Sequence, residues 1–114
     1  GKTMNQIDID KLDFDKAGGL LPAVIQDGAT QQVLMLGFMN RQALEETIKR
    51  GKAVFWSRSK NRLWEKGEES GNTLRVTDIK ADCDNDALLI SVKPAGPACH
   101  TGAVSCFESE AIGE

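Results

Sequence analysis

Residues 20–39 read LLPAVIQDGATQQVLMLGFM, and our expectation of the fold starts from them. Two apolar runs of strand length, 20–26 and 33–39, flank the turn signal Asp27-Gly28. The arrangement predicts a β-hairpin. The second run is apolar on both of its alternating faces, which predicts a central strand that is buried within a sheet.

One helix is expected directly after the hairpin. Asn40 is a favourable N-cap, because its side-chain oxygen can accept a hydrogen bond from the first helical turn. Leu44 and Ile48 lie four residues apart and give the helix a narrow apolar stripe. Gly51 can adopt the left-handed conformation that ends a helix. These residues predict a single helix between Asn40 and Gly51.

Further strands are expected at 53–57, 73–83 and 88–93, whereas the charged stretch 58–72 is expected to be a loop. Within the strand at 73–83 the apolar phase shifts between Val76 and Ile79, which predicts a β-bulge. The sequence therefore predicts a mainly β protein with one helix.

Composition limits the class of protein. A length of 114 residues predicts one domain, 1–114, in which residues 1–19 form a loosely held N-terminal arm. The net charge of −3 disfavours non-specific binding of nucleic acid, and no apolar run approaches the roughly 20 residues of a membrane span. No secretory signal pattern opens the sequence. Three cysteines suit a disulfide scaffold poorly, so we expect reduced thiols and a cytoplasmic location.

All three cysteines and the only histidine lie in the last third of the chain, as Cys83, Cys99, Cys106 and His100. The absence of a Cys-x-x-Cys pair argues against a zinc ribbon and against a thioredoxin-like redox centre. Three thiolates with an open fourth position would form a catalytic zinc site. A structural site would need a fourth ligand, and the adjacency of His100 to Cys99 makes joint ligation awkward. The alternative is three buried and inert thiols.

Three aspartates alternate around the first cysteine, as Asp82, Asp84 and Asp86. In an extended segment these carboxylates would point to one face and Cys83 to the other. Carboxylates suit a hard cation such as Mg²⁺. An EF-hand is excluded, because Ala87 and Lys93 replace the glycine and glutamate that its loop requires. The alternative is a solvated acidic turn in front of a strand.

A basic segment is interleaved with the two tryptophans of the chain: Trp56, Arg58, Lys60, Arg62, Trp64 and Lys66. Cationic side chains suit phosphate, and tryptophan suits the face of a base or sugar. A short patch for single-stranded nucleic acid would look similar. The remaining alternative is a solvated loop with two core tryptophans.

Three motifs together resemble one known family: WSRSKNRLWEKGEESGN at 56–72, DCDND at 82–86, and GPACHTG at 96–102 followed by SCF at 105–107. In this order they resemble the phosphoribosyl-AMP cyclohydrolases of histidine biosynthesis, and the resemblance covers roughly residues 20–110. The departures are Lys60, where arginine is common in the family, and Glu69, where threonine is common. The second departure argues against Glu69 as a substrate ligand.

The resemblance implies a fold and a set of site residues. Members of this family have a distorted β-barrel-like sheet capped by one helix, and they form an intertwined homodimer. Zinc would be held by Cys99 and Cys106 together with Cys83 of the partner subunit, and magnesium by Asp82, Asp84 and Asp86. His100 would be the catalytic residue. The implied contacts to the substrate are Trp56, Arg58, Lys60, Arg62, Trp64, Lys66, Glu68, Ser70 and Thr101.

The resemblance also implies a reaction on a small molecule. The substrate carries a phosphoribosyl group on N1 of adenine, which makes C6 electrophilic. A zinc ion supplies hydroxide at neutral pH, and attack at C6 breaks the N1–C6 bond. The product is the phosphoribosyl-formimino aminoimidazole carboxamide ribotide of the third step of histidine biosynthesis. His100 is the only side chain whose unperturbed pKa suits the proton transfer; alternatively it only orients a ligand.

Two other classes of function stay open at this stage. A zinc-dependent deaminase would also attack C6 of adenine, but its His-x-Glu and Cys-x-x-Cys signature is missing from this sequence. A non-enzymatic metal-binding module would need a closed metal site. The sequence also leaves open whether the chain acts alone or as one half of a fusion with the pyrophosphohydrolase of the preceding step.

Overall fold

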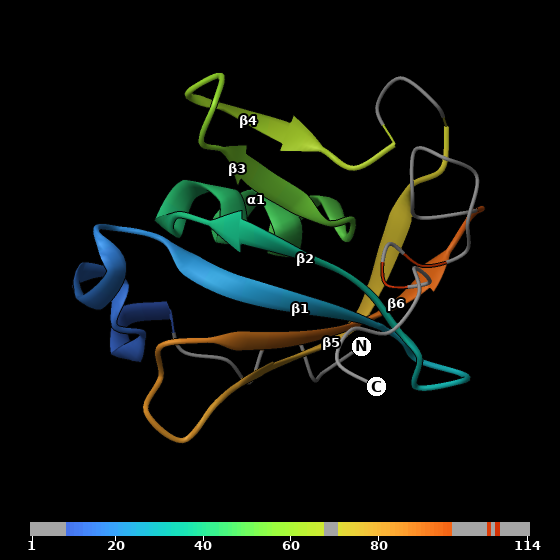
Figure 1. Cartoon of the computed structure of the whole chain (residues 1–114), viewed down its shortest axis with the longest axis horizontal. Helices are drawn as coiled ribbons and strands as arrows, with labels where there is room; N and C mark the ends of the chain where they lie inside the picture. Colours follow the sequence, from blue (N-terminus) through green and yellow to red (C-terminus); the bar gives the residue numbers. More distant parts are fainter. Residues whose placement is uncertain (1–8, 68–70, 97–104, 106, 108–114) are drawn as a thin grey trace, which may run out of the picture.

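The computed structural model of the chain describes residues 9–67, 71–96, 105 and 107 (Figure 1). These residues form a mainly β structure with one α-helix among them. In chain order the elements are η2 (Ile9–Lys11), η3 (Phe14–Ala17), β1 (Leu21–Asp27), β2 (Val33–Met39), α1 (Arg41–Arg50), β3 (Val54–Ser57), β4 (Arg62–Glu65), β5 (Leu74–Ala81) and β6 (Leu88–Pro94), where η denotes a 3₁₀ helix.

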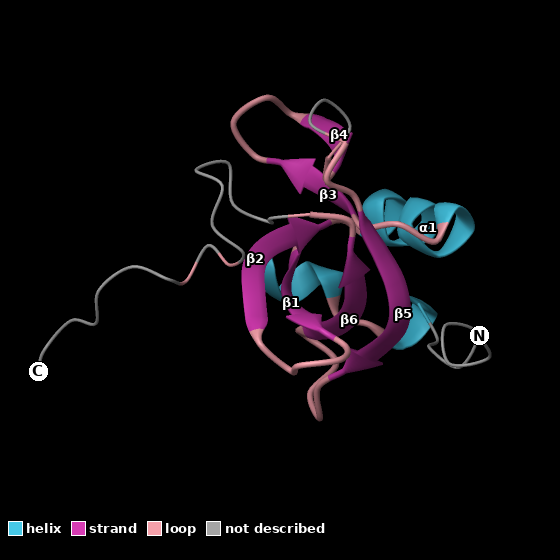
Figure 2. Cartoon of the chain, turned by 90° about the vertical axis from the view of Figure 1, so that its right-hand side faces the viewer, coloured by secondary structure: helices cyan, strands magenta, loops and turns pink. Residues whose placement is uncertain are grey.

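The strands form a four-stranded sheet in the order β2-β1-β6-β5 and a separate two-stranded sheet of β3 and β4. β1 and β2 are antiparallel, so the predicted hairpin is confirmed. β6 returns to lie parallel to β1 and antiparallel to β5. The predicted bulge is confirmed by a shift of register between Val76 and Asp78. Figure 2 shows the larger sheet strongly curved, but the described strands do not close into a barrel.

The expectation that the second hairpin strand is central is wrong. Only β1 pairs with β2 among the described strands, so β2 lies at an edge of the four-stranded sheet. Leu34 and Met39 are fully buried, whereas Val33 and Leu36 keep 39% and 44% of their surface exposed. An apolar sequence reports the preference of a strand for burial, but the pairing partners decide where in the sheet it lies.

The helix α1 begins and ends where the sequence predicts. The Asn40 side chain accepts a hydrogen bond of 2.8 Å from the Ala43 N–H. Gly51 has a φ of 72° and donates its N–H to the Thr47 carbonyl at 2.9 Å. Leu44 is fully buried, and Ile48 packs partly buried against the core. The stripe predicted from residues four apart therefore faces the protein interior, and α1 packs beside β2 and β3 (Figure 1).

Part of the N-terminal arm packs on the core within the residues that the structure describes. Leu12 and Phe14 belong to the core, with 7% and 9% of their surface exposed. The Asp13 N–H donates to the Asn85 carbonyl at 2.7 Å, across to the turn between β5 and β6. Two buried apolar side chains and this bond attach the segment 12–14 to the core. Residues 1–8 lie outside the described residues, so the loosely held arm over 1–19 stays a prediction.

The sequence predicted a loop for the whole stretch 58–72, but part of this stretch is a strand. It contains β4, which pairs with β3 from Ser57↔Arg62 to Val54↔Glu65. Asn61 closes the intervening turn with a φ of 51°. The strand is short and flanked by charge, and its stability comes from a partner strand instead of its own apolar pattern. Within the described ranges, none of the helices has the length and apolar composition needed to cross a membrane.

Candidate substrate pocket and metal-ligand turn

A pocket of about 500 Å³ lies between β2 and the β3–β4 hairpin. Strand β2 supplies one wall, while β3, the turn after it and β4 supply the other. The lining residues are Met35, Leu36, Gly37, Phe38, Phe55, Trp56, Ser57, Arg58, Ser59 and Trp64. The pocket thus brings together two segments that α1 separates in the sequence.

Aromatic rings form the part of the pocket that lies on the core. The Phe55 ring is 1% exposed, and its centroid lies 5.3 Å from that of Trp64 at an interplanar angle of 39°. A Cβ atom added at Gly37 would lie 2.5 Å from the Phe55 Cδ1 atom. The Phe55 ring therefore lies directly against the backbone of β2, in space that the missing side chain of Gly37 leaves open. Trp64 packs at a tilt against it and gives a surface on which a flat ligand ring could pack.

Positive charge lies over two aromatic rings beside the pocket. The Arg58 guanidinium carbon is 3.9 Å from the centroid of the Phe38 ring. The Lys66 ammonium nitrogen lies 5.8 Å from the ring centre of Trp64. Both geometries lie within the roughly 6 Å range of cation–π attraction. The site can therefore hold a planar apolar group next to an anionic group.

The structure brings together some of the substrate-binding residues expected from the sequence but not others. Trp56, Arg58 and Trp64 line the pocket. Lys60 and Arg62 are exposed and are not among the lining residues, and Arg62 donates to the Leu63 carbonyl at 2.9 Å. Lys66 only borders the pocket through Trp64. The remaining candidates, Glu68, Ser70 and Thr101, lie outside the described residues.

Sequence reasoning missed Gly37, Phe38 and Phe55 as pocket residues. Each lies in a strand whose apolar character predicts a place in the core, and Phe55 is indeed buried. The sequence places the 33–39 strand and the basic segment in separate elements and gives no sign that they meet. Only the packing of the β3–β4 hairpin against β2 brings Phe38 to Arg58.

The acidic motif forms a reverse turn between β5 and β6, not an extended segment. The Asp82 N–H donates to the Ala87 carbonyl, and the Asn85 N–H donates to the Asp82 carbonyl, both at 3.0 Å. Asn85 has a φ of 58°, and the Asp86 N–H donates to the Asp82 carboxylate at 2.9 Å. The prediction that the three carboxylates face away from Cys83 by strand alternation is therefore wrong, because a turn has no two-residue period.

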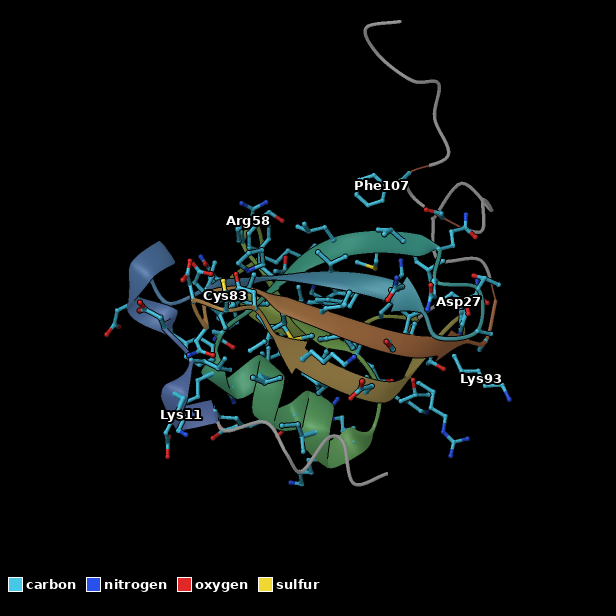
Figure 3. All side chains as sticks on the ribbon, turned by 90° about the horizontal axis from the view of Figure 1, so that it is seen from below. Lys11, Asp27, Arg58, Cys83, Lys93 and Phe107 are labelled. Atoms are coloured by element: carbon cyan, nitrogen blue, oxygen red, sulfur yellow. The ribbon has the colours of Figure 1, made fainter. Side chains whose placement is uncertain are left out.

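Cys83 is exposed on this turn and has a free thiol (Figure 3). No three Cys, His, Asp or Glu side chains converge on a point suited to a metal ion within the part of the chain that the structure describes. Cys99, His100 and Cys106 lie outside that part. The donor types of the turn, one accessible thiol and several carboxylates, suit metal ions chemically, and a complete site needs ligands from elsewhere.

Ser105 attaches its segment to β2; the sequence marked it only as part of the 105–107 motif and gave it no role. Its side chain is 2% exposed. The Ser105 hydroxyl donates to the Val33 carbonyl at 2.6 Å, lies 3.2 Å from the Leu34 carbonyl, and accepts the Phe107 N–H at 3.0 Å. The two residues on either side of Cys106 are thus connected to each other and to the edge of the sheet.

Ser105 and Cys83 lie at opposite ends of the four-stranded sheet. Cys83 precedes β6, whose first residue Leu88 is level with Ala23 of β1. Ser105 bonds to Val33, which is level with Gln26 at the other end of β1. The two levels, Ala23 and Gln26, are three residues or about 10 Å apart along β1. Across the sheet, β1 lies between β6 and β2, so these two strands are two strand spacings apart. Figure 3 accordingly shows Cys83 and Phe107 well apart.

Fold and pocket together define a class: a small, mainly β domain with a pocket suited to a planar ring that carries an anionic group. Within that class, the chain belongs to the phosphoribosyl-AMP cyclohydrolase family, because the model of this family matches residues 35–108. The matched range includes both walls of the pocket, the turn with Cys83, and the segment of Ser105.

Curated relatives agree with this family. The chain is 64% identical over 97 residues to the histidine biosynthesis bifunctional protein HisIE of Bacteroides thetaiotaomicron, with 85% of the chain and 48% of the relative covered. It is 59% identical over 99 residues to the HisIE protein of Campylobacter jejuni, with 87% and 48% covered. It is 57% identical over 99 residues to the phosphoribosyl-AMP cyclohydrolase of Cenarchaeum symbiosum, with 87% and 92% covered. The chain thus spans about half the length of the bifunctional relatives it matches.

Proposed function

We propose that this chain catalyses the hydrolytic opening of the adenine ring of phosphoribosyl-AMP in histidine biosynthesis. The observation that carries the proposal is a pocket with an aromatic wall and an adjacent guanidinium, in a chain that belongs to the cyclohydrolase family. The substrate has the matching parts, a flat base and phosphate groups. The proposal concerns the activity of this domain.

Within the pocket, the residues have separate tasks. The ring of Trp64, which packs at a tilt against Phe55, offers packing area for the base. Arg58 can give charge-assisted hydrogen bonds to a phosphate. Binding of this kind acts on the ground state and the transition state alike, so Arg58→Ala should chiefly raise KM.

We propose further that the reaction depends on zinc held by three thiolates, Cys83, Cys99 and Cys106. The exposed and free thiol of Cys83 fits this role, since it is accessible to a metal ion. Zinc, when bound, would supply hydroxide at neutral pH for the attack on C6. Thiolate ligands need a reducing compartment, so the proposal requires the cytoplasm.

The position of Ser105 supports a zinc site shared between two subunits. Two thiolates on one zinc lie less than about 5 Å apart, since each Zn–S bond is about 2.3 Å long. The flanking residues of Cys106 are about 10 Å from the turn of Cys83 along the strands alone, and two strands away across the sheet. We therefore propose a homodimer in which Cys83 of the partner subunit completes the zinc site of Cys99 and Cys106.

Magnesium is proposed at the turn of Asp82, Asp84 and Asp86. The carboxylates share one short turn, which suits an oxygen-liganded cation, although they do not form a complete site by themselves. Substrate phosphate would supply the missing oxygens. Asp84→Asn should weaken magnesium dependence while zinc stays bound; loss of zinc in this variant would contradict the division into two metal sites.

His100 is proposed as the group that transfers a proton during ring opening, because it is the only imidazole of the chain. His100→Ala should lower kcat with little change in KM, since proton transfer matters only in the transition state. A wild-type kcat in a variant with full zinc would instead assign His100 a purely structural role.

The decisive experiment combines turnover with subunit exchange. The absorbance change on adding phosphoribosyl-AMP should appear with wild-type protein and vanish with a zinc chelator. Cys83→Ala and Cys99→Ala should each be inactive. Unfolding and refolding the two variants together should restore part of the activity, because one site of the mixed dimer carries neither lesion. No recovery despite proven exchange would contradict the shared site, and no turnover by wild-type protein would contradict the function.

A further inference from the structure

The contact between Arg58 and Phe38 assigns a function to a residue that looks like part of the core. Phe38 lies on β2 and is half-buried, while Arg58 directly follows β3 and is exposed. The guanidinium carbon lies 3.9 Å from the centre of the Phe38 ring, which is a close cation–π contact. Both side chains line the pocket.

Arg58 differs from Arg41 and Arg50 in what surrounds its charge. Arg41 pairs with Asp10 at 2.9 Å, and Arg50 pairs with Glu46 at 2.9 Å and with Glu65 at 3.4 Å. Among the described residues no carboxylate lies within 4.0 Å of Arg58, and its side chain forms no hydrogen bond with another described residue. The Phe38 ring contacts the guanidinium without neutralising it, so the N–H donors are available to an anion.

A free arginine side chain loses rotamer entropy when it becomes fixed on a ligand. A ring that already holds the guanidinium at the pocket reduces that loss, because part of the ordering has occurred before the ligand arrives. The ring also occupies only the face of the cation, and the N–H groups that bind phosphate lie in the guanidinium plane.

We propose that Phe38 is a positioning residue that presets Arg58 to bind the phosphoryl group of the ligand in this pocket. The inference deepens the proposed function and rests on it for the identity of the ligand. It also fixes the direction in which the ligand lies: the base packs toward Trp64 and Phe55, and the phosphoryl group lies toward Phe38 and Arg58.

The experiment compares ligands with and without a phosphate. Trp56 and Trp64 are the two tryptophans of the chain and both line the pocket, so intrinsic fluorescence can report binding. Dissociation constants are measured for AMP and for adenosine with the wild type, Phe38→Leu, Phe38→Tyr and Arg58→Ala. Phe38→Leu should weaken AMP binding by about 2- to 5-fold, the effect of an exposed cation–π contact, and leave adenosine binding unchanged. Phe38→Tyr keeps the aromatic face and should bind AMP like the wild type.

A double mutant separates positioning from general packing. In the Arg58→Ala background, Phe38→Leu should no longer affect AMP binding, because the ring then has no guanidinium to hold. Equal losses for AMP and adenosine, or an undiminished effect in that background, would overturn the inference. So would a wild type that does not bind AMP. Phe38→Met serves as a second non-aromatic variant if Phe38→Leu does not fold.

The proposed function can fail separately. If Phe38→Leu weakens AMP binding only when Arg58 is present, but the wild type does not turn over phosphoribosyl-AMP, the proposed reaction is wrong and the positioning role holds. Full turnover without this dependence on Arg58 would sink the positioning role alone.

Discussion

Thr47 carries the most informative single test of the fold, because one buried hydroxyl connects α1 to β3. Its side chain is fully buried. The hydroxyl oxygen lies 2.9 Å from the Ala43 carbonyl and 3.1 Å from the Val54 carbonyl, to either of which it can donate. It also accepts the Val54 N–H at 3.0 Å. We consider Thr47→Val, which keeps the shape of the side chain and removes the hydroxyl.

The expected cost follows from the backbone groups that lose a partner. A buried donor or acceptor left unsatisfied costs about 1–3 kcal/mol. The Val54 N–H loses its acceptor in Thr47→Val, and one carbonyl loses its donor, since the hydroxyl has a single proton. We expect Thr47→Val to lower the free energy of unfolding by about 2–3 kcal/mol. Thr47→Ser keeps the hydroxyl and loses one methyl group, so it should cost only about 1 kcal/mol.

Urea unfolding at fixed protein concentration measures both variants. With a slope of about 1–3 kcal/mol per molar urea, Thr47→Val should lower the midpoint by about 0.7–3 M, and Thr47→Ser by about 0.3–1 M. Holding the concentration constant removes the effect of subunit association on stability. A Thr47→Val protein that unfolds at the same urea concentration as Thr47→Ser, or at a higher one, would refute the reasoning.

Two other substitutions test the ends of elements around the site. Asn40→Ala should lower the free energy of unfolding by about 1 kcal/mol, because the Ala43 N–H loses its hydrogen-bond acceptor. Asn40→Asp keeps an acceptor and should cost less. Equal thermal unfolding midpoints for these two variants would contradict the capping role. Ser105→Ala removes the hydroxyl that bonds to β2, so the affinity of the proposed zinc site, measured by competition with a chelator, should fall by about fivefold, the effect of one net hydrogen bond. Ser105→Thr keeps the hydroxyl as a control, and unchanged zinc affinity in Ser105→Ala would separate this serine from the metal site.

Elements that depend on near neighbours in the chain were predictable from the amino-acid sequence. The β1–β2 hairpin follows from two apolar runs around Asp27-Gly28. The limits of α1 follow from Asn40 and Gly51, whose caps bond within four residues. The bulge near Val76 follows from a change of phase within one strand. The family is recognised from three motifs, whose order and residue types can be read without any knowledge of the fold.

Tertiary structure decided what depends on residues far apart in the chain. β2 lies at an edge because β6 returns to pair with the other side of β1. β4 is a strand because β3 accepts it as a partner. The 82–87 segment is a turn because β5 and β6 pair directly on either side of it. In each case the local pattern allowed two outcomes, and a distant partner selected one of them.

The pocket residues, too, are partly predictable from the sequence and partly a result of packing. The sequence supplied Trp56, Arg58 and Trp64, because tryptophans interleaved with cations are visible in a single segment. Phe38 reaches Arg58 only after α1 has turned the chain back and packed the β3–β4 hairpin against β2. Residue types are read from the sequence, but contacts between segments arise from packing. The types of side chain available to the pocket were therefore predictable from the sequence, and the packing of β2 against the β3–β4 hairpin determines which of them lie together.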